Sequence, residues 1–318
     1  MTFETRGSRF KRWKKPLTIA FFLMLIVLFT LLARRIDWSE VLQTLSDFKL
    51  RTLLIAGGLT LCSFLVYASF DLIGRTYIRQ PLRCKQILPV GIISYAFNLN
   101  LSAWVGGIAM RYRLYSRLGV STSNIARILG LSLATNWFGY MALAGVVFSS
   151  GLVTMPPGWK VSTLALQGIG VLLVLISLGY LAACQFAKKR AWSIKGIEIN
   201  LPSLRMACLQ LALGALNWSL MAAVIFTLLP AKLDYPLVLG VLLISAIAGV
   251  ITHIPAGLGV LEAVFIALMQ HEASRGSLLA GLIAYRAIYF ILPLLIALLM
   301  YLAVEAKAKT LRVKKTPA

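Results

Sequence analysis

Two charged residues lie inside long apolar stretches of this 318-residue sequence. Glu262 occurs in the run Gly-Val-Leu-Glu-Ala-Val-Phe, and Arg286 lies within the apolar segment 278–303. An ionised group in such surroundings is costly and is a functional candidate by default. Glu262 can bind a cationic group or carry a proton, and Arg286 can bind a phosphate in a bidentate manner. A structural role for Glu262 and snorkelling of Arg286 to the outer interface are the alternatives.

Arg111 and Asp71 are two further candidates. Arg111 follows Gly106 by five residues, as Glu262 follows Gly257, and the two charges are opposite. One hypothesis is that Arg111 and Glu262 pair, with two separate interfacial charges as the alternative. Asp71 precedes Arg75 by four residues, a spacing that predicts a local ion pair on a helix.

His253 and Tyr289 complete the set of candidate site residues. His253 titrates near neutral pH in its unperturbed form, which makes it a candidate proton-sensitive group. A hydrogen-bonded packing role is the alternative. Tyr289 lies three residues after Arg286, in the same apolar segment.

Glycine and proline interrupt the apolar pattern beside these charges. The first break contains Gly106 and Gly107, and the second contains Pro255, Gly257 and Gly259. Such residues break helices and permit close backbone approach. We therefore predict two helical hairpins, over 87–120 and 237–271.

Composition indicates an all-α integral membrane protein. The sequence is 59% hydrophobic and only 13% charged, against about 25% charged residues in soluble domains. The net charge is +22, but Lys and Arg fall in short loops between apolar runs, as topology selection requires. This distribution argues against nucleic acid as a partner and favours contact with anionic phospholipid head groups.

Eight apolar segments are candidates for crossing a bilayer. They are 17–33, 53–73, 87–105, 128–148, 163–186, 207–229, 237–253 and 278–303. Eight full spans would place two basic loops outside, against the positive-inside rule. Six full spans plus two re-entrant hairpins place both termini in the cytoplasm, with 24 Lys and Arg on the cytoplasmic side and seven outside.

The six-span arrangement divides the chain into three parts. Residues 1–16 form a basic cytoplasmic N-terminus, 17–303 form a single polytopic transmembrane domain, and 304–318 form a basic cytoplasmic tail. Within the domain, 17–150 and 160–303 each read span, span, hairpin, span. Three crossings per half make this a predicted inverted repeat, an architecture typical of transporters.

The first external loop predicts a short helix. Asp37 and Glu40 have capping-box spacing, and apolar residues follow at helical spacing. A helix lying on the outer surface and an ordinary connector helix are equally consistent with this pattern.

No motif for catalysis, cofactor or metal is present in the sequence. The four cysteines form no CxxC pair, and only two histidines occur. There is no P-loop, HExxH, GxSxG or dinucleotide fingerprint. We expect a protein that is not an enzyme, does not hydrolyse ATP and needs no cofactor.

The motifs named above resemble those of the lysylphosphatidylglycerol synthase transmembrane-region family. Residues 255–262 resemble its P-x-G-x-G-x-x-E signature. Arg286, Tyr289 and Pro293 resemble its R-x-x-Y-x-x-x-P pattern, and Gly107 to Arg111 resembles a motif in its first half.

The resemblance implies a domain that moves lipid between leaflets. In bifunctional members a separate soluble domain makes the lipid, and this chain ends soon after its last apolar segment. The expectation is therefore a lipid flippase or phospholipid-transport component of the bacterial inner membrane, with Arg286 and Arg111 as phosphate ligands. A non-transporting scaffold for a lipid-metabolism protein is the alternative, and a membrane-embedded lipid enzyme is the third.

Overall fold

The computed structural model describes residues 38–78, 81–101, 103–153, 162–188, 190–194, 197–229, 233–252, 254 and 257–313. The predicted span 17–33, the basic segment 1–16, Asp37, His253 and Pro255 lie outside these residues, as do residues 314–318 of the tail.

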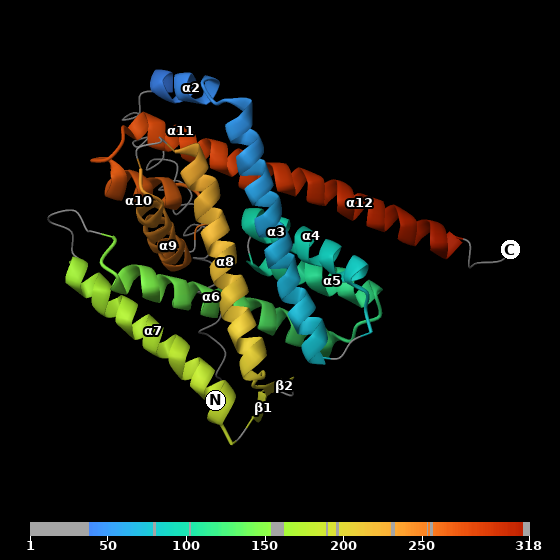
Figure 1. The fold of residues 1–318 in the computed structure, drawn as a ribbon. Coiled ribbons are helices and arrows are strands. Elements are labelled where there is room, and N and C mark those ends of the chain that lie inside the picture. The colour runs from blue at the N-terminus through green and yellow to red at the C-terminus, as the bar shows by residue number, and fades with distance from the viewer. Residues whose placement is uncertain are drawn as a thin grey trace, which may run out of the picture.

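Helices make up nearly all of the described chain, which confirms the all-α prediction (Figure 1). In chain order they are α2 (Trp38–Ser46), α3 (Leu50–Ile78), α4 (Cys84–Leu101), α5 (Ala109–Arg117), α6 (Thr122–Ser149), α7 (Thr163–Phe186), α8 (Leu204–Leu228), α9 (Tyr235–Thr252), α10 (Val260–Met269), α11 (Arg275–Tyr285) and α12 (Leu292–Val313). Two π-helical turns, η1 (Ala103–Ile108) and η3 (Arg286–Ile291), interrupt them. A small antiparallel sheet of β1 (Ala191–Ile194) and β2 (Ile197–Asn200) is the addition that the sequence did not predict.

Six helical stretches of the described residues are long and apolar enough to cross a membrane. They are Leu50–Ile78, Thr122–Ser149, Thr163–Phe186, Leu204–Leu228, Tyr235–Thr252 and Arg275–Val304. Four of them contain the predicted spans that begin at 53, 128, 163 and 278, and Leu204–Leu228 covers all but the last residue of the predicted span 207–229. The sixth is α9, which the prediction had assigned to a hairpin.

The chain folds back on itself after α4. At Gly106 an added Cβ would overlap the carbonyl of Phe97, and at Gly107 it would lie 2.8 Å from the Asn98 Oδ1. Only glycine permits this approach of η1 to α4. In the second predicted hairpin, α9 packs against the short α10. Re-entry of these hairpins into a membrane and the inverted repeat stay predictions.

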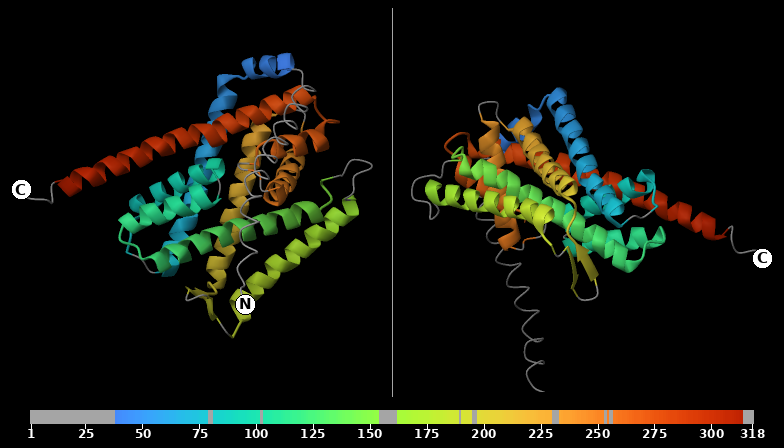
Figure 2. Two further views of the ribbon diagram at one scale, coloured as in Figure 1. Left: turned by 180° about the vertical axis from the view of Figure 1, so that it is seen from behind. Right: turned by 60° about the horizontal axis from the view of Figure 1, so that its bottom comes forward.

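The centre of the bundle is built from α3, α6 and α8, which pack against one another. Figure 1 shows α7 on the outside of α6, and Figure 2 shows α12 crossing α4 and extending past the bundle. The predicted short helix in the first loop is α2, which lies on α11 through contacts of Val41 with Leu279 and Ala280.

Glycines set the crossing of α6 and α8. A Cβ at Gly139 would overlap the backbone of Gly214, and a Cβ at Gly214 would overlap the carbonyl of Thr135. Small residues let helix backbones approach closely, which is how membrane helices gain packing energy. Helix α3 packs against both α6 and α8. The crossing therefore helps to position the site residues described below.

We predict that Gly139→Val lowers the stability of the purified protein by about 1–3 kcal/mol, because the added side chain forces the two backbones apart. Thermal unfolding in detergent measures the loss. Gly130→Val on the same helix is the matched control, since Gly130 has no atom within 4 Å of an added Cβ. Equal behaviour of the two variants would contradict the prediction.

Candidate functional site

A fully buried ion pair joins α3 to α5. The Arg111 Nε donates to Oδ1 and Oδ2 of Asp71 at 3.3 and 3.1 Å, and its Nη2 donates to Oδ1 at 3.2 Å. Arg111 is 1% exposed and Asp71 is 0% exposed. The fork of the guanidinium thus meets the carboxylate with two nitrogens, the geometry that suits a buried pair.

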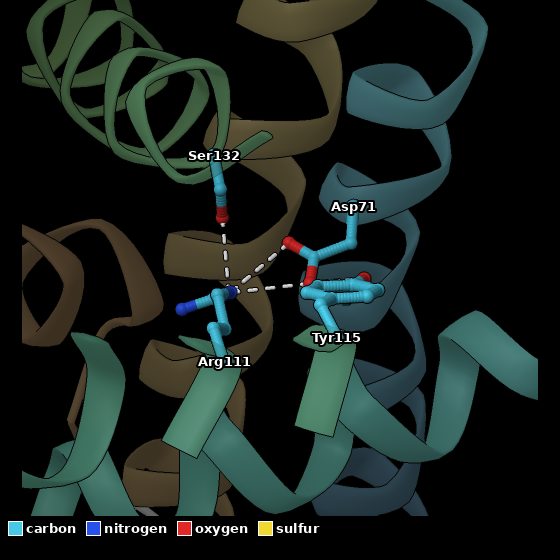
Figure 3. A network of polar contacts seen from close by, with 4 residues as sticks. All are labelled: Asp71, Arg111, Tyr115 and Ser132. Atoms are coloured by element: carbon cyan, nitrogen blue, oxygen red, sulfur yellow. Dashed lines mark hydrogen bonds and ion pairs between the residues drawn. The ribbon is translucent and has the colours of Figure 1, made fainter. Parts of the chain in front are cut away.

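Two hydroxyls complete this first ion pair, as Figure 3 shows. The Tyr115 hydroxyl donates to the Asp71 Oδ2 at 2.9 Å, and the Arg111 Nη2 donates to the Ser132 Oγ on α6 at 3.2 Å. Arg111 and Tyr115 are four residues apart, so α5 presents both on one face. The network therefore fixes α3, α5 and α6 relative to one another.

These contacts correct two sequence predictions. Asp71 does not form the predicted pair with Arg75, which donates instead to the Leu82 carbonyl at 2.9 Å. Arg111 does not meet Glu262, because its guanidinium faces Asp71. The spacing of Asp71 and Arg75 within one helix indicated a local pair. The packing of α5 against α3 instead places the buried Arg111 next to Asp71.

A second ion pair joins α10 to η3. The Arg286 Nε donates to the Glu262 Oε1 at 2.5 Å, and its Nη2 donates to the Glu262 Oε2 at 3.2 Å and to the Gly257 carbonyl at 2.9 Å. Each side chain is 15% exposed. The structure thus brings together the two charged residues that the sequence singled out first, and leaves both partly accessible.

Left-handed glycines shape the segment before α10. Gly257 has φ +55° and Gly259 has φ +76°, conformations that side chains rarely adopt. This bend turns the Gly257 carbonyl toward Arg286, and α10 starts after it at Val260, two residues before Glu262.

The π-turn η3 begins at Arg286 and sets the position of Tyr289. Pro293 cannot donate to the Tyr289 carbonyl and its ring collides with that carbonyl in a regular helix, which explains a widened turn here. On the opposite side, the Asn100 Nδ2 donates to the Phe290 carbonyl at 3.1 Å. This bond ties the end of α4 to η3, as irregular backbone in an apolar environment requires.

Tyr289 lies in a buried cluster of hydroxyl groups. Its OH lies 2.6 Å from the Ser63 Oγ and 2.9 Å from the Tyr95 OH. The Ser63 Oγ also donates to the Asn217 Oδ1 at 2.8 Å. The cluster therefore connects α3, α4, α8 and η3 at the centre of the bundle.

Aromatic rings connect the hydroxyl cluster to both ion pairs. Tyr95 stacks on Tyr67 with ring centroids 3.6 Å apart, and the Arg111 guanidinium lies 5.7 Å from the Tyr67 ring. On the other side, Tyr289 stacks on Tyr285 at 5.2 Å, one residue before Arg286. Polar and aromatic groups thus run from one ion pair to the other.

Comparison with known proteins decides the family. The sequence profile of the "Lysylphosphatidylglycerol synthase TM region" matches residues 17–297. The chain belongs to this family.

Two relatives have sequences that align over most of the chain. "Inner membrane protein YbhN" of Escherichia coli (strain K12) is 49% identical over 311 residues, which are 96% of this chain and 98% of that protein. "Uncharacterized protein slr0712" of Synechocystis sp. is 28% identical over 264 residues, 81% of this chain and 80% of that protein. Together with the six apolar helices, these matches identify a multi-pass membrane protein.

The family motifs coincide with the second ion pair. Glu262 ends the run that resembles the P-x-G-x-G-x-x-E signature, and Arg286 and Tyr289 begin the run that resembles the R-x-x-Y-x-x-x-P pattern. In this member the two motifs meet through the bonds of Arg286 to Glu262 and Gly257.

Several site residues carried no sequence signal. Ser63, Tyr95, Tyr115 and Asn217 are uncharged residues of a kind common in apolar helices, and only their mutual contacts mark them. Within the described residues, no group of three or more His, Cys, Asp or Glu is arranged to hold a metal ion.

We predict that Asp71→Asn destabilises the protein by about 3–5 kcal/mol, because it leaves Arg111 buried without its counter-charge. The double variant Asp71→Leu/Arg111→Met should lose less stability than the sum of the losses in the single variants Asp71→Leu and Arg111→Met. Unfolding in detergent measures all three. Asp47→Asn, an exposed acidic residue, is the control. Strict additivity would argue against the pair.

Two neighbouring tyrosines allow a matched test of the hydroxyl cluster. Tyr289→Phe should cost about 1–3 kcal/mol, because it deprives Ser63 and Tyr95 of a partner. Tyr285→Phe should cost nothing, since the buried Tyr285 OH has no hydrogen-bond partner among the described residues. Thermal unfolding of both variants measures the difference, and a larger loss in Tyr285→Phe would refute it.

Proposed function

We propose that this chain moves phospholipid between the leaflets of a bacterial inner membrane. The observation that carries the proposal is the Glu262–Arg286 pair, which lies among apolar helices yet is partly exposed. Ionisable residues in membrane-spanning segments mark substrate and ion pathways. The name of the 49% identical relative supports the choice of membrane.

Arg286 is the proposed ligand of the lipid phosphate. Its guanidinium already binds a carboxylate through two nitrogens, and a phosphate presents oxygens at a similar spacing. A phosphate that enters would compete with Glu262 for these donors. Glu262, once displaced, would contact a cationic group of the head group or take up a proton.

Arg111 is not a phosphate ligand in this proposal. It is 1% exposed and already shared between Asp71 and Ser132. To bind lipid it would have to leave Asp71 unpaired in the core, at a cost of several kcal/mol. We assign it instead to the rigid part of the bundle against which the mobile part moves.

The two irregular turns are the proposed moving parts. These turns are η1 and η3. Asn100, at the end of α4 just before η1, donates to the Phe290 carbonyl of η3, so a shift of one turn would displace the other. π-turns occur frequently at functional sites in helices. Opening of the Gly257–Gly259 segment would release Arg286 from its carbonyl acceptor.

The proposed orientation of the protein in the membrane rests on the distribution of its positive charges. With both termini in the cytoplasm, 24 Lys and Arg lie on the cytoplasmic side and seven lie outside. The proposed activity moves lipid without making or breaking a covalent bond, so we do not propose that the protein is an enzyme.

The test is lipid exchange in liposomes that contain the pure protein and head-group-labelled phosphatidylglycerol, phosphatidylethanolamine or cardiolipin. We expect exchange that falls about tenfold or more in Glu262→Gln and in Arg286→Ala, equivalent to at least 1.4 kcal/mol. Glu272→Gln and Arg275→Ala change exposed residues in the loop before α11 and at the first position of α11, and these variants should exchange lipid at the wild-type rate.

Absence of exchange in folded protein, with and without a proton gradient, would refute the proposal. Stoichiometric co-purification of a protein partner from membranes would then favour the scaffold interpretation. Exchange that is unchanged in Glu262→Gln would remove Glu262 from the mechanism and leave Arg286 as its centre.

A further inference from the structure

A groove lies between the C-terminal part of α3 and the N-terminal part of α8. Its volume is about 450 Å³, and its lining from α3 consists of Ser69, Leu72, Ile73 and Thr76. The α8 side is lined by Ser203, Arg205, Met206, Leu209 and Leu213. The groove lies at the end of α8 opposite to α11, which contacts Leu228 through Gly281.

The lining changes from polar to apolar along the groove. Thr76, Ser203 and Arg205 lie where α3 ends and α8 begins. Leucine side chains then line the walls as far as Ser69 and Leu213, about 10 Å further along at 1.5 Å per residue. A ligand that fits this lining has a charged end and an apolar chain.

Arg205 supplies the positive charge among the residues that line the groove. It is exposed and forms no hydrogen bond or ion pair with any described residue. Arg190 lies close by, because its Nη2 donates to the carbonyl of Pro202 at 3.0 Å. In the sequence, segments 74–86 and 187–206, which include the end of α3 and the start of α8, together hold nine Lys and Arg and one acidic residue.

The polar end of the groove is braced. The Tyr77 OH donates to the Asn200 carbonyl at 2.8 Å, and the Asn200 N–H donates back to the Tyr77 OH at 2.7 Å. These bonds hold the end of α3 to β2. Arg205 therefore lies beside a junction of α3 and β2 that these hydrogen bonds hold in place.

We propose that this groove binds one anionic phospholipid of the surrounding bilayer. Arg205 and the hydroxyl of Ser203, which accepts from the Met206 N–H and keeps its own proton to donate, hold the phosphate, and an acyl chain lies along Leu72, Leu209 and Leu213. The positive charge excludes a cationic head group, and the apolar walls exclude a free soluble anion. The site is distinct from the Glu262–Arg286 pair, and its existence does not depend on lipid movement by the protein.

Photo-crosslinking in nanodiscs tests the proposal. The full-length protein is placed in a phosphatidylcholine bilayer with a trace of phosphatidylglycerol that carries a diazirine on its acyl chain, and labelled peptides are identified by mass spectrometry. We expect labels on α3 between Leu72 and Thr76 and on α8 between Met206 and Leu213. The same probe on phosphatidylcholine should label these peptides far less.

Two changes in the groove should reduce this labelling, one by removing the charge and the other by filling the space. Arg205→Ala should reduce it about tenfold, which corresponds to 1.4 kcal/mol, while Arg205→Lys should retain most of it. Leu209→Trp should block the acyl chain by filling the space. Arg51→Ala, an exposed arginine at the other end of α3, is the matched control and should label as the wild type does.

The outcomes separate this inference from the proposed function. Equal labelling by both lipids, or labelling unchanged in Arg205→Ala, would show only ordinary bilayer contact and would overturn the inference. Labelling that persists in Glu262→Gln and Arg286→Ala while lipid exchange is absent from every protein would uphold the groove and refute transport.

Discussion

The buried Asp71–Arg111 pair is the interaction on which the arrangement of the other helices depends. Two full charges are held in a bundle whose surroundings are apolar, at 0% and 1% exposure. Such a pair is tolerated only when geometry and extra hydrogen bonds offset the lost hydration. Tyr115 and Ser132 supply those bonds, so α3, α5 and α6 have one arrangement that satisfies all four groups. The close Gly139–Gly214 crossing then brings α8 against this fixed frame.

The two ion pairs differ in how far their side chains are exposed. The first is sealed and shared among three helices. The second is partly exposed, rests on an irregular turn and a glycine bend, and has one acceptor from the backbone. A buried pair and a partly exposed pair thus lie in one bundle, connected by the hydroxyl cluster around Tyr289.

The sequence predicted the apolar spans and the accessible pair's members, and it missed the pairing of the buried one. Glu262 and Arg286 stand out because single charges in apolar runs are rare. The partner of Arg111 could not be read, since Asp71 lies 40 residues away and spacing says nothing about which helices meet. Ser63, Tyr95 and Asn217 are ordinary residues of apolar helices, so their cluster becomes visible only in three dimensions. Helix α9 is long and apolar enough to cross a membrane, and the Pro/Gly break beyond it is the reason why the sequence placed it in a hairpin, which stays a prediction.

The π-turn at η3 also fixes the rotational phase of the last helix. A residue inserted into an α-helix rotates everything after it by about 100° around the axis. The face of α12 that meets α4, including the contact of Tyr301 with Phe97, is therefore the face that the widened turn selects. If the turn relaxed to regular helix, α12 would rotate by that angle and offer α4 a different row of side chains. A local change of hydrogen bonding beside Arg286 would thus be converted into rotation of a long helix at the far side of the bundle.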